Sequence, residues 1–231
     1  MLADLQRSFH ASRFIFAGSI LAALAAAVNV HFILRVGISV SHLTGDVSRL
    51  SAEFVLRPDI SIEALRLFLS ICGFVVGAGL SGFIIHHPSV TLNRPYGRAV
   101  IGIGLTMALA WYVERYAPTI AYPLAAAACG FQNALATRYR GIVIRTTHIT
   151  GLLTDFGQLI GMKLAGNNIE PWKPLMHALL AGAFIVGSVL GVAMDMIFRQ
   201  NTLIVIAVAY VITGVVWTIL KHGLHADTHP T

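Results

Sequence analysis

The chain has 231 residues, of which 56% are apolar and only 11% are charged, and its mean hydropathy is +0.76. Soluble domains carry about 25% charged residues, so this composition excludes a soluble globular protein, a disordered chain and a nucleic-acid-binding domain. It predicts one membrane domain over residues 1–231, embedded in the lipid bilayer and binding no nucleic acid. The net charge of +6 fits the excess of Lys and Arg in the cytoplasmic loops of membrane proteins.

Six apolar segments are candidates for membrane-spanning helices. The first, 14–34, follows Arg7 and Arg13 and is longer than the roughly 7–15 apolar residues of a secretory signal, so we expect an uncleaved first span. In lipid only a helix satisfies the backbone of an open chain. The other five segments cover residues 67–85, 99–113, 117–137, 174–194 and 201–220.

Two further segments, 39–56 and 143–165, are intermediate in polarity. Each contains glycine, histidine, hydroxyl side chains and at least one charge. They are too polar for an ordinary lipid-facing helix and too apolar for a loop, so we expect broken or re-entrant segments. The predicted fold is therefore all-α: a transmembrane helical bundle with six spans and two such segments.

An internal repeat relates the two halves of the chain. The first H-x-T-G motif, His42 to Gly45, matches the second, His148 to Gly151, with an offset of 106 residues. Residues 74–77 match 184–187 with an offset of 110, and the matched asparagines, Asn29 and Asn133, are 104 residues apart. Residues 14–115 and 117–220 would then be two halves with three spans each. An odd number of spans predicts that the halves are inverted relative to each other in the membrane.

The distribution of positive charge predicts the orientation. With six spans, ten of the sixteen Lys and Arg residues fall on the side that holds both termini, which places the termini in the cytoplasm. We expect residues 221–231 to form a disordered tail. The three histidines of this tail are too loosely spaced to predict a metal site: His222, His225 and His229.

The paired motifs are the strongest candidates for a binding site. Glycine can interrupt a helix, and the free N–H groups of the following half-helix would favour an anion. Threonine hydroxyls can cover freed backbone groups in a membrane, and histidine can carry a proton. The alternative is that both histidines only cap helices at the membrane interface. The predicted ligand-binding residues are His42, Thr44, Gly45, Asp46, Asn133, His148, Thr150, Gly151 and Asp155.

Other polar and small residues admit two interpretations each. Asp155 shares a helix face with His148 and is either a proton or coupling-ion site or the partner of a basic group such as Arg145. The amides of the spans either line a pathway or hydrogen-bond between helices. The two G-x-x-x-G pairs, 73–77 and 187–191, allow close helix packing within the fold or across a homodimer interface. No catalytic motif appears, so we expect neither an enzyme nor a cofactor or metal.

Three stretches carry a resemblance to a known family: residues 41–45, residues 129–134 with the sequence Cys-Gly-Phe-Gln-Asn-Ala, and residues 145–151 followed by Thr154 and Asp155. The chain resembles the YoaK-like bacterial membrane proteins over about residues 14–220, a family with a domain of unknown function. The usual family pattern has Asn after the first Thr-Gly, where this chain has Asp46, and an acidic residue near Asn29. The resemblance implies an inner-membrane protein and supplies no substrate or reaction.

The repeat and the paired polar motifs favour a transporter or channel-like protein for a small polar or anionic substrate or ion. A membrane assembly or regulatory protein without transport activity is the second hypothesis, and an intramembrane enzyme is the third. The position of the two H-x-T-G motifs discriminates between the first two. Motifs that face each other at mid-membrane would favour transport, whereas motifs at opposite surfaces would favour assembly.

Overall fold

A computed structural model describes residues 2–56, 59–85, 95–135, 138–139, 142–143 and 145–226. The fold is all-α, as the composition predicts. Its helices are α1 (Leu2–Val36), α2 (Leu43–Leu56), α3 (Ile62–Ile85), α4 (Tyr96–Glu114), α5 (Pro118–Leu135), α6 (Ile149–Leu164), α7 (Trp172–Phe198) and α8 (Thr202–Ala226), with a 3-10 turn at Arg199–Asn201. A minimal antiparallel hairpin joins β1 (Arg138–Tyr139) to β2 (Ile142–Val143), which pair in the register Arg138↔Val143 and Tyr139↔Ile142.

Four helical stretches of the described residues are long and apolar enough to cross a membrane: Phe14–Val36, Ile62–Ile85, Tyr96–Glu114 and Trp172–Lys221. Large apolar side chains are exposed along them, among them Phe83, Leu105 and Val189. Contiguous apolar surface of this extent is typical of a lipid-facing bundle, which indicates a membrane protein. The helix α5 is not among the four because Gln132, Asn133 and two prolines lower its hydropathy.

The long helices pack as pairs, and small residues set two of these contacts. The helix α1 lies along α7, and α3 lies along α5. A side chain at Gly187 would meet the backbone of Ala23, and a side chain at Gly77 would meet the backbone of Ala127. Four residues further along, Gly191 faces Ala27. The G-x-x-x-G pairs therefore bring helices of the same chain together, as this motif does in membranes.

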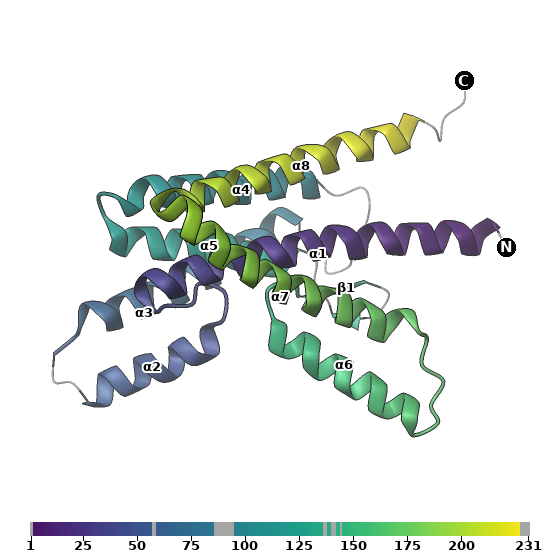
Figure 1. Cartoon of the computed structure of the whole chain (residues 1–231), viewed down its shortest axis with the longest axis horizontal. Helices are drawn as coiled ribbons and strands as arrows, with labels where there is room; N and C mark the ends of the chain where they lie inside the picture. Colours follow the sequence, from purple (N-terminus) through teal and green to yellow (C-terminus); the bar gives the residue numbers. More distant parts are fainter. Residues whose placement is uncertain are drawn as a thin grey trace.

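These contacts also give the directions of the helices. Contact positions rise together along α1 and α7, so the two helices run parallel; Gly73 on Pro123 and Gly77 on Ala127 make α3 and α5 parallel in the same way. The helices α4 and α8 run antiparallel, because Gly97 lies on Gly214 whereas Gly104 lies on Ala207. In Figure 1 the six long helices accordingly follow the long axis of the molecule, with both termini at one end.

The core lies where α5 meets α1, α4 and α8. Its largest buried side chains include Phe32, Met107 and Tyr210, and α5 contributes alanines along much of its length. Phe32 contacts Tyr122 edge to face, with ring centroids 5.7 Å apart. A helix enclosed in this way does not need an apolar surface on every side, which explains how α5 accommodates two amides.

The helices α2 and α6 differ from the rest in length and direction. Figure 1 shows both beginning near the middle of the molecule and diverging toward opposite ends of the bundle. Each packs against the helix that follows it, α2 on α3 and α6 on α7. Their starts coincide with the two H-x-T-G motifs, so this architecture brings both motifs near the middle of the molecule.

Two local expectations differ from the structure. The chain leaves the helical conformation before each H-x-T-G motif, not at its Thr-Gly pair, because Thr44 and Gly45 already belong to the first turn of α2. The helix α8 continues to Ala226, so residues 221–226 are helical where a disordered tail was expected; residues 227–231 lie outside the described residues. The backbone hydrogen bonds of a helix lie within the helix, so its end can continue into polar residues without a packing partner.

Candidate functional site

The segment between α1 and α2 folds back into the bundle. After Val36, Gly37 adopts a positive φ of 68°, a conformation that glycine adopts without steric cost. The chain then returns along α1, where Asn29 Oδ1 accepts hydrogen bonds from Ser39 Oγ at 2.8 Å and from the Ser41 backbone N–H at 3.3 Å. Asn29 thus holds an extended segment beside α1, two turns before the end of that helix.

His42 stands at the inner end of this segment. Its backbone N–H donates to Ser39 Oγ, and its Nδ1 lies 2.8 Å from Ser41 Oγ. The imidazole contacts the ring of Phe184 edge to face at 5.2 Å. Burial lowers the pKa of His42, and the nearby His148 lowers it further. The histidines of the two motifs therefore lie close enough to interact electrostatically.

Asp46 lies in the first turn of α2 and is only 3% exposed. Burial raises the pKa of this carboxyl to about 6, against the hydrogen bond from the Ser39 backbone N–H and the charge of Arg49, which both lower it. Carboxylates are stabilised at the N-terminus of a helix. Asp46 thus provides α2 with a negative charge of its own at the inner end.

The segment that leads into α6 is held by an amide. The Nε2 of Gln132 donates to the Leu21 carbonyl at 2.9 Å and to Thr146 Oγ1 at 3.0 Å, and its Oε1 accepts from the Tyr210 hydroxyl at 2.6 Å. This one side chain connects α5, α1 and α8 to the start of α6. Next along the chain, Thr147 is fully buried, and its hydroxyl has no hydrogen-bond partner among the described residues.

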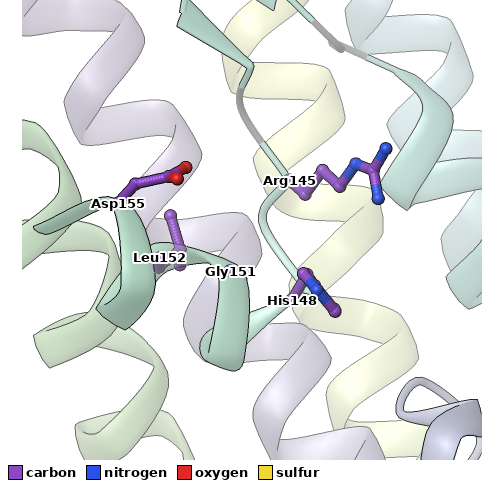
Figure 2. A pocket seen from close by; sticks show the side chains of 5 residues that line it. All are labelled: Arg145, His148, Gly151, Leu152 and Asp155. Carbon is purple, nitrogen blue, oxygen red and sulfur yellow. The ribbon is translucent and has the colours of Figure 1, made fainter. Parts of the chain in front are cut away.

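A cavity of about 220 Å³ lies at the beginning of α6, and Arg145, His148, Gly151, Leu152 and Asp155 line it. Figure 2 shows these side chains around the first turns of the helix. A Cβ at Gly151 would come within 2.5 Å of the His148 ring, so only glycine leaves the imidazole in its place. His148 precedes α6 without capping it through its side chain, which leaves the first N–H groups of the helix available.

Asp155 faces a histidine that sequence reasoning missed. His177 of α7 is 1% exposed, and its Nε2 lies 3.5 Å from Asp155 Oδ2. Its Nδ1 lies 2.8 Å from the Lys173 carbonyl and must donate to it. A protonated His177 would therefore form an ion pair with Asp155. The only signal for this in the sequence is a single histidine inside an apolar span.

The structure brings together some of the predicted site residues. His148, Gly151 and Asp155 share the cavity, with His42 close by and Asp46 one turn into α2. Thr44, Gly45 and Thr150 lie on exposed faces of α2 and α6. Asn133 lies on α5 with a buried Oδ1 that has no partner among the described residues. Within the same residues, no three His, Cys, Asp or Glu side chains are arranged to hold a metal ion.

Comparison with known proteins gives the family and no function. No curated protein and no solved structure matches the chain. A family model described as "Protein of unknown function (DUF1275)", which corresponds to the YoaK-like proteins, matches residues 17–216. The match covers most of the chain and agrees with the resemblance of its motifs, so the chain belongs to the DUF1275 family.

Proposed function

We propose that the protein is a multi-pass membrane transporter for small anions, which bind between the starts of α2 and α6. One observation carries the proposal: both helices begin at mid-length of α1 and α7. The His42 ring lies on Phe184, in the middle of α7. Ile149, the first residue of α6, packs against the same Phe184 and against Ala22 and Ala26, near the middle of the apolar part of α1. Transporter sites commonly lie at mid-membrane on discontinuous helices.

The chemistry of the cavity favours an anion. The first N–H groups of a helix and the positive end of its dipole attract negative charge, and at α6 the N-cap residue His148 makes no side-chain hydrogen bond to them. Arg145 and His148 add positive or protonatable groups to the lining. A volume of about 220 Å³ is below the 300–1,000 Å³ typical of sites for drug-sized ligands, which suits a small anion.

Helix directions support six crossings, with α2 and α6 re-entering the membrane without crossing it. If all the α-helices crossed, each would reverse direction, and α4 and α8 would run parallel. They run antiparallel, as six crossings require. The stretch Trp172–Lys221 is 50 residues long and contains two helices, and α5, enclosed by its neighbours, supplies the remaining crossing.

The pattern of contacts supports inverted halves. Gly77 lies on Ala127 and Gly187 on Ala23. The two glycines are 110 residues apart and the two alanines 104, the same offsets that relate the repeated sequences. An in-plane two-fold axis would relate the α1–α7 pair to the α5–α3 pair. With ten of the sixteen Lys and Arg on the side of the termini, we place both termini in the cytoplasm and the protein in a bacterial inner membrane.

Anion binding is tested with the full chain purified in lipid nanodiscs. Chloride, nitrate, formate, phosphate and sulfate salts are added at constant ionic strength, and the melting temperature is measured, because a ligand of the native state raises it. We expect one of these anions to stabilise the wild type, and the same anion to enter proteoliposomes that contain the protein. Absence of both stabilisation and uptake for every anion would refute the proposal.

Matched glycine variants locate the site. Gly151→Ala displaces the His148 ring, whereas a Cβ at Gly45, the equivalent position of the first motif, meets nothing within 4 Å. We expect Gly151→Ala to weaken anion binding by about tenfold, or ~1.4 kcal/mol, and Gly45→Ala to leave it unchanged. Equal effects of the two variants would contradict a site at α6.

A further inference from the structure

A second polar cluster lies apart from the cavity, where α1, α4 and α7 come together. His31 of α1 is fully buried, and its Nδ1 lies 2.8 Å from Asp195 Oδ1 of α7. Its Nε2 lies 3.7 Å from Glu114 Oε2 of α4. Arg35 Nε, one turn along α1, is 3.7 Å from the same Asp195 oxygen. None of these four residues entered the sequence-based prediction of the site.

The charges of these four residues do not balance unless the imidazole carries a second proton. When His31 is neutral, two carboxylates and one guanidinium give these four residues a net charge of −1, and the carboxylate side chains, 18% and 19% exposed, have lost most of their contact with water. A carboxylate only accepts hydrogen bonds, so Nδ1 carries hydrogen toward Asp195. The opposite nitrogen, Nε2, is buried without a hydrogen-bond partner among the described residues, and it faces the second carboxylate.

The surroundings favour the same protonation state. α1, α4 and α7 end close to the cluster, at Val36, Glu114 and Phe198, and the C-terminal end of a helix favours a cation. Further ionisable groups on the elements that meet here are Tyr122 of α5, which contacts the neighbouring Phe32, Arg66 of α3, and the two arginines that follow the ends of α4 and α7, Arg115 and Arg199. The Arg66 guanidinium lies over the Tyr122 ring, 5.4 Å from the ring centroid.

We propose that His31, Asp195 and Glu114 form a proton-binding site. A proton enters from water through Glu114, whose side chain is 19% exposed, and binds to Nε2. The imidazole then becomes an imidazolium with one N–H toward each carboxylate, and the net charge of the cluster rises from −1 to 0. No electron transfer and no further reactant is required.

This proton site and the anion site share α1. Asn29, two residues before His31, holds the segment that ends in His42. A shift of α1 on protonation would therefore move this segment as well. A further step rests on the proposed function: we infer that the anion binds together with the proton at His31. The proton site itself does not depend on that inference and is tested separately.

The protonation state is measured by NMR of the full chain in nanodiscs, with ¹⁵N-labelled histidine and with the His31 signals assigned from His31→Gln. We expect both ring nitrogens of His31 to be protonated at pH 7. In Asp195→Asn the midpoint of His31 titration should move to lower pH by about one unit or more. A neutral His31 ring at pH 6 would overturn the proposal, as would a midpoint that Asp195→Asn leaves unchanged. Glu114→Gln removes the carboxylate that lies farther from the imidazole, 3.7 Å from Nε2. It should shift the midpoint of His31 titration in the same direction by less.

Coupling is tested by measuring the affinity for the stabilising anion between pH 6 and pH 8.5. We expect affinity to fall with rising pH in the wild type and to depend less on pH in His31→Gln, whereas His225→Gln near the C-terminus behaves as the wild type. The same pH dependence in His31→Gln would overturn the coupling. A doubly protonated His31 in a protein that binds no anion would refute the proposed function and leave the proton site standing.

Discussion

The starts of α2 and α6 share a backbone arrangement and differ in charge. The fourth residue of each helix is buried: Asp46 in α2 and Leu152 in α6. The seventh residue pairs with the following helix in both, but the signs are reversed, with Arg49 bonded to Glu63 in the first half and Asp155 facing His177 in the second.

The difference shows how a duplicated framework can acquire two roles. In α2, the Asp46 carboxylate already brings a negative charge to the first turn of the helix. In α6, Leu152 is neutral and the helix end opens into the cavity with Arg145 and His148. The first motif thus resembles an anion-occupied form of the second, and binding of an external anion is expected mainly at α6.

The largest expected effect concerns the packing that the halves have in common. Gly77→Val and Gly187→Val each place a side chain against the backbone of a partner helix, and each should lower the free energy of unfolding by about 3 kcal/mol or more. Gly79→Val and Gly182→Val, where a Cβ meets nothing within 4 Å, are the matched controls. Thermal unfolding in nanodiscs measures all four. A large loss for only one of the two glycines would show that the halves do not pack equivalently.

The next prediction converts the second half into the first. Leu152→Asp puts a carboxylate where α2 has Asp46, and it should abolish stabilisation by the anion. Leu152→Asn, which adds polarity without charge, should retain part of the response. Leu153→Asp, on an exposed neighbouring position, is the control for added charge. If Leu152→Asp binds the anion as the wild type does, the contrast between the two helices has no functional meaning.

The pH dependence of stability distinguishes Asp46 from its counterpart. Because burial raises its pKa from 3.8 to about 6, the folded state binds more protons than the unfolded state between these values, and stability decreases as pH rises through that range. Above about pH 6 the contribution of Asp46 levels off. The melting temperature of Asp46→Asn should therefore fall less between pH 4 and pH 6.5 than that of the wild type, and parallel curves would contradict the assignment.

The smallest effects are expected at the charge-reversed pairs. Asp155→Asn breaks one pair between a short helix and its neighbour, and Arg49→Gln breaks one such pair together with the hydrogen bond from Arg49 to the Gly37 carbonyl. Arg49, Glu63 and Asp155 are all partly exposed, although His177 is buried, and pairs with an exposed partner contribute about 0–1 kcal/mol. Chemical or thermal unfolding of each variant should show losses within this range. A much larger loss for Asp155→Asn would mean that the pair with His177 is a principal support of α6.

The length of the uncharged apolar stretches was sufficient to predict the long helices, because lipid leaves few alternatives to a helix. The predicted segment 67–85 ends with α3 at Ile85, and the polar segment 39–56 ends with α2 at Leu56. The H-x-T-G motifs mark the starts of α2 and α6, but the helical conformation is interrupted before them and not at their Thr-Gly pairs, as had been expected. The exact point of interruption depends on Gly37, whose positive φ no spacing rule singles out among so many glycines.

Contacts between residues that lie far apart along the chain could not be predicted from the sequence. His31 and Asp195 are 164 residues apart, and Gln132 reaches Leu21 across 111 residues. A single sequence reveals that an amide or a histidine inside a span needs a partner, but it does not reveal which helix supplies that partner. The exposure of Thr44 and Thr150 was missed for a related reason, since the face that a helix turns inward depends on the neighbours it packs against.

The pairing of α1 with α7 has a consequence for biosynthesis. Because α1 leaves the ribosome long before its partner, the small-residue face around Ala23 and Ala27 and the His31 nitrogen that faces Asp195 remain without their native contacts until the second half is made. Neither half of the chain contains both helices of the α1–α7, α3–α5 or α4–α8 pair. A chain stopped after α4 should therefore be degraded, whereas two separately encoded halves, produced in the same cell, should assemble and protect each other.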